Sequence, residues 1–437
     1  MYFFMTKKIF KLALPNIASN ITIPLLGLVD TALMGHLDAL DYLGAIALGS
    51  MIFNMVYWSL GFLRMGTVGF TAQAFGSKDN TQINLIFQRG ILLALALGII
   101  VIAIHPWLIE FGINFTTSGA GVKYFAADYV RIRIWAAPAG LLIMVFSGWF
   151  LGMQNAIYPM IIAIVANVFN IMLSFIFVYY LDMKSAGAAL GTLIAQYLSL
   201  AVAILLFRKK YKYLWQKIEM AKLLNLSEMK SFFKVNSDIF IRTLGIIFVI
   251  SFFTIKSANI SDGILAVNSI LFQFFLFYTF MLDGFANAAE ALTGEYIGLK
   301  NLVNLKKSVK SNFLLGLAFS IVFSLVYFFF GNNLIQLLTN NNEVIKLAKP
   351  LMLWIVIMPL ISFPAFILDG IFIGATASKS LRNAMIISVI FFFIPAYYLL
   401  PFKGTERLWI AFLIFLVARG FTLSLVLKKN IYLKYTN

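Results

Sequence analysis

The chain alternates long apolar runs with short polar connections, and this pattern predicts the fold. Each run has about 20 residues, which is enough for a helix to cross a hydrocarbon core of ~30 Å. The runs lack the two-residue alternation of membrane-barrel strands, and a bilayer interior offers no partner for open strand edges. The predicted spans are residues 12–35, 43–70, 86–108, 125–151, 159–180, 186–207, 239–255, 264–288, 313–330, 351–374, 385–400 and 409–427. The sequence therefore predicts an all-α integral membrane protein with twelve transmembrane helices.

The two halves of the chain match each other when one is shifted along the sequence by a single fixed amount. TAQAFGSKD (71–79) aligns with TGEYIGLKN (293–301), and SGWFLG (147–152) aligns with DGIFIG (369–374). Both alignments need the same difference in residue number, which we call the repeat offset. Six predicted spans in each half give both halves the same orientation in the membrane. We therefore expect two pseudo-symmetric six-helix bundles related by an axis along the membrane normal, a pattern of secondary transporters.

Composition and charge exclude several classes of protein. Hydrophobic residues make up 62% of the chain and charged residues 12%, which is far too apolar for a water-soluble enzyme. The absence of cysteine excludes disulfides and thiolate metal sites. The net charge of +17 comes from 34 Lys+Arg against 17 Asp+Glu, and the positive-inside rule accounts for it without a nucleic-acid partner.

The distribution of basic residues sets the expected topology. Most of them fall in segments that are cytoplasmic if the N-terminus is inside, and the even number of spans then places both termini in the cytoplasm. The densest group occupies one connection, where it faces the anionic lipid of the cell (inner) membrane. We expect an N-lobe over residues 1–207, a basic cytoplasmic linker over 208–233 and a C-lobe over 234–437.

Polar residues inside the first half are candidates for a transport site. A charge at the bilayer centre is costly, so it should face a cavity or a partner. Asp30 lies deep in the first predicted span with no charged neighbour in the local sequence, and desolvation favours its protonated form. Asn167, Asn170 and Ser174 share one face of the fifth span, and Thr192 follows in the sixth. The alternative is that these neutral residues only join helices by hydrogen bonds.

The second half carries acids that the repeat does not duplicate. Asp283 and Asp369 interrupt apolar runs at the positions of Gly61 and Ser147, so both are candidate cavity residues. Other charges have simpler interpretations, which the structure can test. We expect Glu290 and Glu295 to be solvated near the cytoplasmic end, Arg242 to extend its side chain to the interface, and Asp238 to begin the seventh span.

Four stretches together resemble a known family. They are LALPNIASNITIPLLGLVDTALMGHLDALDYLGAIALG, FLRMGTVGFTAQAFGSKD, DGFANAAEALTGEYIGLK and LDGIFIGAT. They resemble the DinF branch of the multidrug and toxic compound extrusion (MATE) transporters of the MOP type, and the resemblance covers essentially the whole chain. It implies twelve helices in two lobes, cytoplasmic termini, and antiport of organic cations against H⁺ or Na⁺.

The resemblance also implies roles for individual residues. Asp30 matches the first-helix acid of cation coupling, Asn170 and Thr192 match the polar residues beside it, and Tyr129 matches a tyrosine that lines the same cavity. Ser174 departs from the pattern, because members of the branch usually carry a second Asp there. A site with one carboxylate suits H⁺ better than Na⁺, although Na⁺ at Asp30, Asn170 and Thr192 stays an alternative.

These observations lead to one main hypothesis and two alternatives. The main hypothesis is a monomeric multidrug efflux antiporter without a cofactor, which exports an organic cation or amphiphile in exchange for H⁺ or Na⁺ by alternating access. The second is a flippase for a lipid or lipid-linked oligosaccharide, which would need basic residues in its central cavity. The third is a membrane enzyme, which is disfavoured because no Asp-rich motif suited to Mg²⁺ and pyrophosphate lies at a cytoplasmic span end.

Overall fold

The computed structural model describes the chain except residues 1, 36–39, 115, 117, 217–219, 224 and 434–437. For residues 2, 3, 23–35, 40, 220, 221 and 226–228 it describes the helical backbone but not the side chains. The described residues are almost entirely helical and contain no strand. The all-α class predicted from the sequence is therefore confirmed.

Eleven segments of the described chain are long and apolar enough to cross a membrane. They correspond to the second to twelfth predicted spans. The first predicted span lies in a 34-residue helix, α1 (Tyr2–Gly35), part of whose side chains lies outside the described residues. An α-helix of that length extends for about 50 Å, which exceeds the thickness of a bilayer core. The chain is thus a multi-pass membrane protein.

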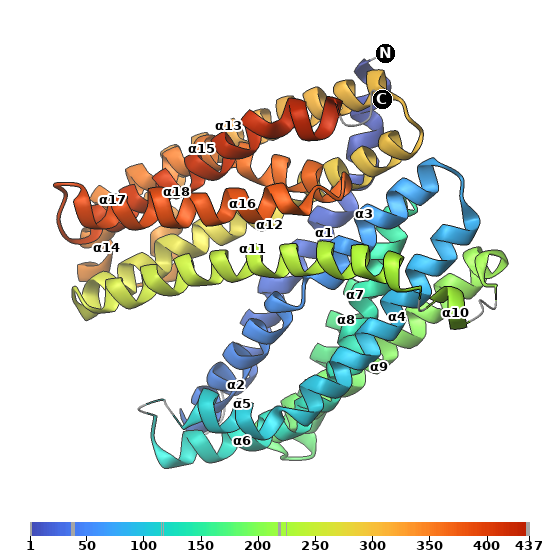
Figure 1. The fold of residues 1–437 in the computed structure, drawn as a ribbon. Helices are drawn as coiled ribbons and strands as arrows, with labels where there is room; N and C mark the ends of the chain where they lie inside the picture. The colour runs from blue at the N-terminus through green and yellow to red at the C-terminus, as the bar shows by residue number, and fades with distance from the viewer. Residues whose placement is uncertain are drawn as a thin grey trace. The chain divides into compact units, whose positions relative to one another are not determined.

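The chain divides into two compact units, which are described separately (Figure 1). The N-terminal unit comprises residues 18–230, and the C-terminal unit comprises residues 1–17 with 231–437. The N-terminal unit holds α2 (Leu40–Ser59), α3 (Phe62–Gly76), α4 (Asn80–Ala103), α5 (His105–Ile113), α6 (Ala120–Arg133), η1 (Ile134–Ala136), α7 (Ala137–Gly152), α8 (Ile157–Phe175), η2 (Ile176–Tyr180), α9 (Lys184–Tyr211), η3 (Lys212–Leu214) and α10 (Met220–Leu223).

The C-terminal unit consists of longer helices that run side by side (Figure 1). Besides the start of α1 it holds most of α11 (Leu226–Ala258), then α12 (Asp262–Gly298), α13 (Leu302–Leu338), α14 (Asn342–Ala348), η4 (Lys349–Leu351), α15 (Met352–Gly374), α16 (Ser378–Ile387), η5 (Ser388–Phe393), α17 (Ile394–Leu399), α18 (Gly404–Leu427) and η6 (Lys428–Tyr432). Its core forms where α15 packs between α12, α13 and α18.

The internal repeat appears in the backbone as well as in the sequence. Lys78 and Lys300 both adopt positive φ, at 57° and 52°, and so do Gln154 and Thr376, at 59° and 50°. The members of each pair are related by the repeat offset. Positive φ is uncommon for residues other than glycine, so its recurrence at one offset shows that both halves turn the chain in the same way.

The same offset governs how helices approach each other. A Cβ atom on Gly148 of α7 would lie 2.5 Å from the carbonyl oxygen of Arg64 on α3. A Cβ atom on Gly370 of α15 would lie 2.2 Å from the carbonyl oxygen of Ala286 on α12. Gly148 and Gly370 are related by the repeat offset, and so are Arg64 and Ala286. Only a residue without a side chain fits so close a contact, which explains why these glycines recur in the repeat.

The N-terminal segment is attached to the C-terminal unit by packing and by an ion pair. Gly284 of α12 lies against Ala13 and Ile17 of α1. The Lys8 ammonium donates hydrogen bonds of 2.8 and 2.7 Å to the two carboxylate oxygens of Glu295. This contact corrects the expectation that Glu295 is solvated, because the residue is 9% exposed. Glu290 is also buried, so proximity to a helix end did not mean exposure at either position.

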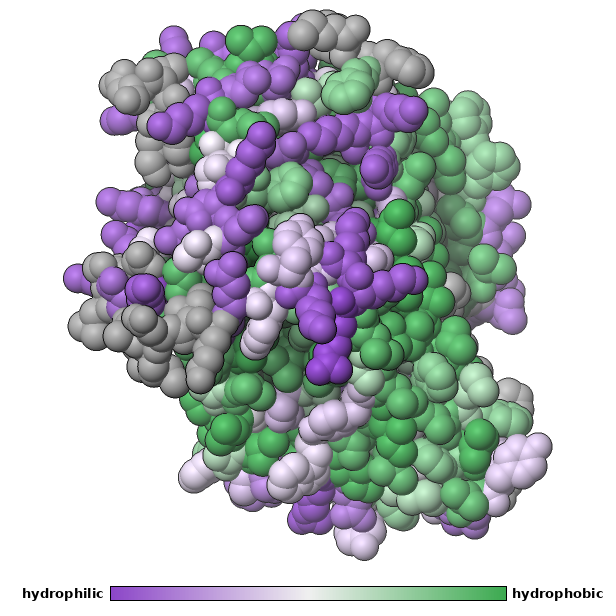
Figure 2. All heavy atoms as spheres, turned by 90° about the vertical axis from the view of Figure 1, so that its right-hand side faces the viewer, coloured by the Kyte–Doolittle hydropathy of each residue, from purple (hydrophilic) through white to green (hydrophobic). Residues whose placement is uncertain are grey.

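Large apolar side chains cover much of the outer surface. On α13, Phe328, Phe329 and Phe330 are each more than half exposed. Figure 2 shows one face on which hydrophobic residues gather over a broad area beside a region of hydrophilic residues. Such exposure is incompatible with a water-soluble surface and suits contact with lipid chains.

Candidate functional site

The polar residues predicted on the fifth and sixth spans come together in the N-terminal unit. The Asn170 side-chain amide on α8 donates a 2.8 Å hydrogen bond to the Thr192 hydroxyl on α9. That hydroxyl in turn donates to the Ala188 carbonyl oxygen at 2.9 Å. Ser174 lies one helical turn beyond Asn170 and is fully buried. We call Asn170, Ser174 and Thr192 the polar cluster.

Two glycines on α9 allow the cluster to form. A Cβ atom on Gly191 would lie 2.7 Å from the backbone nitrogen of Ser174, and one on Gly187 would lie 2.9 Å from the backbone of Phe177. Residues spaced by four lie on one helix face, so this GxxxG spacing lets α9 approach α8 closely. Thr192, next to Gly191, is thereby brought within hydrogen-bonding distance of Asn170.

The polar cluster retains unused hydrogen-bonding capacity. The Asn170 side-chain oxygen and the Ser174 hydroxyl oxygen are both buried and have no hydrogen-bond partner among the described residues. A buried polar atom left unpaired costs about 1–3 kcal/mol, so two in adjacent turns indicate a ligand or a further side chain. An amide oxygen accepts only, and therefore it suits a proton donor or a cation.

Asp30 belongs to the same compact unit, in the part of α1 that follows residue 17. Its side chain lies outside the described residues, and its role stays a prediction. Among the side chains that the structure describes, no three His, Asp or Glu residues gather to form a metal site.

Asn167 and Tyr129, also predicted to line the cavity, lie on two different helices. Asn167 is half-buried on α8, one turn before Asn170. Tyr129 on α6 is buried, and its hydroxyl lies 3.2 Å from the Ser50 hydroxyl and accepts a hydrogen bond from Arg133. The Arg133 guanidinium also lies 4.7 Å from the ring centroid of Phe53.

The sequence analysis gave no role to Arg133, which lies inside the predicted span 125–151. The residue closes α6 and lies within a continuous candidate span, Ala120–Gly152. The available signal was its spacing of four from Tyr129, because residues with that spacing share a helix face. A cation against two aromatic rings is a stabilising arrangement, so Arg133 fixes the tyrosine in place.

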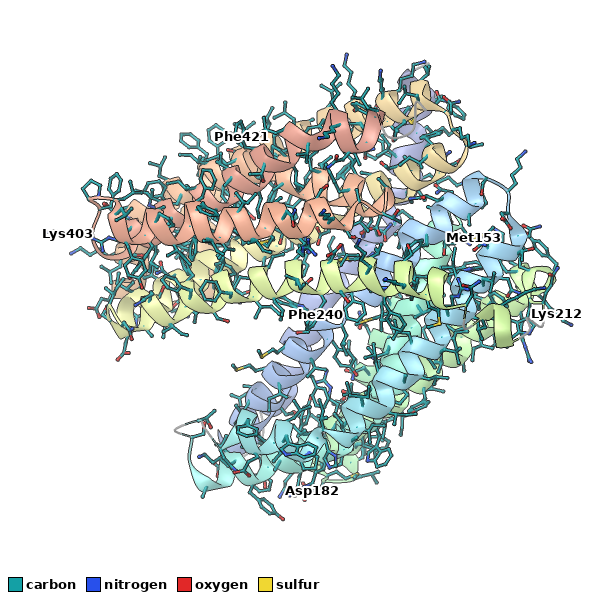
Figure 3. All side chains as sticks on the ribbon, in the orientation of Figure 1. Met153, Asp182, Lys212, Phe240, Lys403 and Phe421 are labelled. Carbon is teal, nitrogen blue, oxygen red and sulfur yellow. The ribbon has the colours of Figure 1, made fainter. Side chains whose placement is uncertain are left out.

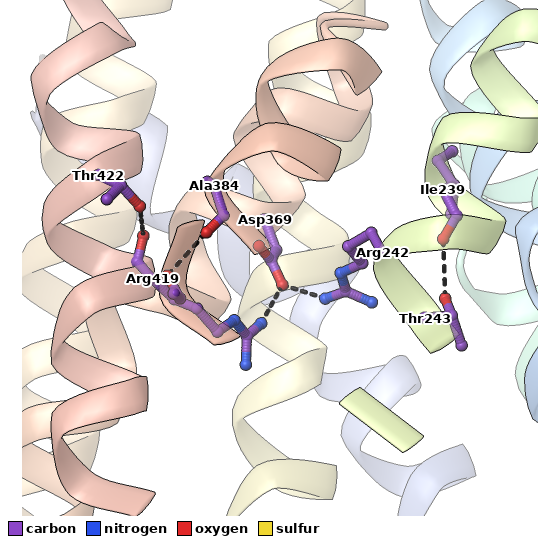
Figure 4. Close-up of polar contacts among 8 residues, drawn as sticks. Ile239, Arg242, Thr243, Asp369, Ala384, Arg419 and Thr422 are labelled. Atoms are coloured by element: carbon purple, nitrogen blue, oxygen red, sulfur yellow. Dashed lines mark hydrogen bonds and ion pairs between the residues drawn. The ribbon is translucent and has the colours of Figure 1, made fainter. Parts of the chain in front are cut away.

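The C-terminal unit contains a buried ion-pair cluster (Figure 4). One carboxylate oxygen of Asp369 on α15 accepts from Arg419 on α18 at 2.6 Å and also from Arg242 on α11. All three side chains are at most 9% exposed. The Nε atoms of both arginines have no hydrogen-bond partner among the described residues. Asp283, half-buried on α12, interacts electrostatically with Arg419.

Buried charged residues of the C-terminal unit correct two expectations from the sequence. Arg242 does not extend to an interface, because Asp369 holds its guanidinium inside the unit. Asp238 does not begin its helix but lies inside α11, where its carboxylate accepts from Ser378 at 2.8 Å and Arg382 at 2.6 Å. In both cases the partner comes from a distant helix, and therefore local sequence gave no sign of it.

The two polar clusters are not copies of each other. At the repeat offset, Asn170, Ser174 and Thr192 correspond to Phe392, Ala396 and Ile414. In the opposite direction, Arg242, Asp369 and Arg419 correspond to Asn20, Ser147 and Tyr197. The halves therefore share a backbone plan and differ in the chemistry of their interiors.

An all-helical membrane fold built from two repeated halves is an architecture of secondary transporters. The MatE family model matches residues 15–176 and 240–399, once in each half. The chain belongs to this family of multidrug and toxic compound extrusion transporters, whose members are transporters and not enzymes.

Relatives with known names support this assignment. The chain is 35% identical over 424 residues to DNA damage-inducible protein F of Escherichia coli K12, covering 97% of this chain and 92% of that protein. It is 23% identical to a probable multidrug resistance protein NorM of Thermotoga maritima, over 78% of this chain and 74% of that one. It is 26% identical to multidrug and toxin extrusion protein 1 of Danio rerio, over 93% and 69%.

Solved structures share the fold. An outward-facing multidrug resistance MATE transporter of the MOP superfamily gives a TM-score of 0.88 at 20% identity, covering 99% of this chain and 97% of that one. A MOP superfamily transporter from Pyrococcus furiosus, described with a binding pocket of reversed polarity, gives a TM-score of 0.88 at 18% identity over the same shares. The expected two-lobed transporter architecture is thus confirmed.

Proposed function

We propose that the chain is a cation-coupled efflux antiporter in which Asp30 and the polar cluster form the coupling site. The supporting observation is the pair of unpartnered buried oxygens on Asn170 and Ser174. A protonated carboxyl group or a bound cation is the kind of partner that would satisfy them. Asp30 is in the same unit and is the acid whose position in the first helix fits that role.

The proposed coupling ion is H⁺. The three side chains of the polar cluster are neutral, and Ser174 stands where the resemblance to the DinF branch implies a second carboxylate. A hard cation such as Na⁺ prefers several charged or carbonyl oxygens, whereas one carboxyl group suffices for a proton. If Na⁺ bound at Asp30, Asn170 and Thr192 instead, Na⁺ would replace H⁺ as the coupling ion.

The proposed cycle couples two equilibria. In the outward-facing state a proton neutralises Asp30, and the neutral form favours release of an organic cation or amphiphile. In the inward-facing state proton loss favours reloading from the cytoplasm. The two ligands need not touch each other, because it is enough that each stabilises one of the two states. The proposed location is the cell (inner) membrane with both termini in the cytoplasm, and the proposed working unit is a monomer.

The flippase alternative is not favoured. Two of the three relatives named above are multidrug resistance or extrusion proteins. Contrary to the expectation for Arg242, that residue and Arg419 lie inside the C-terminal unit, but the carboxylate of Asp369 already engages both. They therefore offer no bare cationic surface for a lipid-linked phosphate among the described side chains.

The test is export of ethidium into the lumen of everted vesicles, whose cytoplasmic face is outward, with one imposed gradient at a time. A pH difference of one unit contributes about 1.4 kcal/mol per proton exchanged, which corresponds to about a tenfold concentration ratio of substrate. We expect Asp30→Asn to fold and insert but to lose this proton-driven accumulation. Asp182→Asn, at an aspartate with an 80% exposed side chain in the same unit, is the matched control and should transport normally. Unchanged proton-driven efflux by Asp30→Asn would refute the mechanism, and efflux driven only by Na⁺ would replace the coupling ion.

A further inference from the structure

Basic residues gather on one face at the end of α9. Arg208, Lys209 and Lys212 follow Leu205 at helical spacings, which places all four on the same side of the helix. Together they line a cleft of about 570 Å³. Lys212, labelled in Figure 3, marks this end of the N-terminal unit, whereas Asp182 lies at its opposite end.

An apolar stripe leads into this cleft from the membrane-spanning part of the same helix. Leu198 and Leu205 are 37% and 62% exposed, and Ala201 between them is also exposed. The three residues lie on one face at helical spacing. Leu205 belongs to both features, so the apolar stripe continues directly into the basic cleft. In Figure 2, the face that carries this end of the unit shows hydrophilic residues bordering a hydrophobic surface.

The chain around the cleft is held in place by buried contacts. The Arg89 side chain on α4 is 6% exposed and donates to the carbonyl oxygens of Leu223 at 3.0 Å and Lys222 at 2.8 Å. Phe207 on α9 stacks on Phe87 of α4, with ring centroids 4.9 Å apart. These contacts hold the end of α9 and the segment α10 against α4.

The described residues that line the cleft include three basic side chains and no acidic one. Among the described side chains, Arg208, Lys209 and Lys212 take part in no ion pair. We propose that this face binds one anionic phospholipid, with the head-group phosphate among Arg208, Lys209 and Lys212 and an acyl chain along Leu198, Ala201 and Leu205. Basic clusters at the end of a membrane helix attract anionic lipids, and the adjoining stripe distinguishes a lipid from a soluble phosphate.

The test uses the full chain in non-ionic detergent, titrated with phosphatidylglycerol or with phosphatidylcholine of the same acyl chains. Native mass spectrometry counts the bound lipids. We expect a first phosphatidylglycerol that binds more tightly than phosphatidylcholine. In the variant Arg208→Gln/Lys209→Gln/Lys212→Gln, its affinity should fall on the order of tenfold to 100-fold.

The matched control removes the same charge from the same connection, as Lys222→Gln/Lys230→Gln/Lys234→Gln, and should retain the first lipid. Equal losses in both variants would show a general basic surface and overturn the proposal. Competition by free glycerol phosphate at the lipid's own concentration would show that the phosphate alone is bound, and would also overturn it. Leu205→Ser keeps every charge. It should weaken the binding of phosphatidylglycerol without changing the weak binding of glycerol phosphate.

Discussion

At the residue scale, buried charges in this protein are engaged by partners from distant helices. One oxygen of Asp369 serves two guanidiniums that come from α11 and α18. Burial of charge is costly unless each group has a partner, so the carboxylate is what allows two arginines to remain inside. Arg419 additionally lies 5.5 Å from the ring centroid of Phe415, which gives its cationic face an aromatic neighbour.

This arrangement predicts an unequal response to substitution. Asp369→Asn removes the negative charge and leaves two buried guanidiniums, which should cost about 3–5 kcal/mol of unfolding free energy. Arg242→Gln should cost less, because Asp369 keeps its bond to Arg419. Thermal unfolding followed by size-exclusion chromatography measures both. The control is Asp262→Asn at an exposed aspartate, with an expected loss of unfolding free energy below about 1 kcal/mol. A wild-type melting temperature for Asp369→Asn would contradict the view that Asp369 neutralises two buried arginines.

At the element scale, the polar cluster depends on how closely two helices approach. α8 and α9 are among the most extensively packed neighbours in the N-terminal unit, and Gly191 lies where their backbones meet. The spacing of Asn170 and Ser174 was visible in the sequence, because residues four apart share a helix face. The pairing of Asn170 with Thr192 was only implied, since no local pattern states which face of the next helix turns toward Asn170.

Gly191→Ala should therefore destabilise the protein although alanine favours helices. Its Cβ atom would lie 2.7 Å from the Ser174 hydroxyl oxygen, so the helices must separate. We expect a cost of about 1–3 kcal/mol, larger than the gain of at most about 1 kcal/mol from replacing a helical glycine. Proton-driven efflux should fall as well, because separation lengthens the hydrogen bond between Asn170 and Thr192.

A second glycine serves as the control for this prediction. Gly263 in α12 has room for a Cβ atom, whose nearest neighbour would be a Leu347 side-chain carbon at 3.6 Å. Gly263→Ala should leave the melting temperature unchanged or raise it. If both substitutions had the same effect, close approach at Gly191 would not be the cause.

At the scale of the whole molecule, the two halves share a backbone arrangement, and their buried polar side chains differ. Gly148 and Gly370 make the same close contact in the two halves, and Lys78 and Lys300 make the same turn. The segment 1–17 nevertheless belongs to the unit formed by the second half of the chain. The predicted division into lobes 1–207 and 234–437 with a linker 208–233 describes the sequence repeat, whereas contacts assign the N-terminal segment differently.

The topology can be tested directly because the chain contains no cysteine. Lys234 and Lys346 are exposed and are separated by three spans predicted from the sequence, residues 239–255, 264–288 and 313–330. Lys346→Cys should react with a membrane-impermeant maleimide on intact cells, and Lys234→Cys should react only in everted vesicles. If both cysteines reacted from the same side, the number of spans between them would be even and the predicted topology would be wrong. If Lys234→Cys reacted on intact cells and Lys346→Cys only in everted vesicles, the orientation would be the reverse of the predicted one.

The sequence by itself determined the helical class, the spans and the repeat, because apolar length and a match at one fixed offset are properties of the linear chain. It also selected Asn170, Ser174 and Thr192, since a polar group in an apolar helix is conspicuous without knowledge of its neighbours. Only the tertiary structure decided which partners the buried groups take. Lys8 with Glu295, Arg382 with Asp238, and Arg242 with Asp369 lie far apart in the chain, and such pairs form through helix packing that no local periodicity encodes.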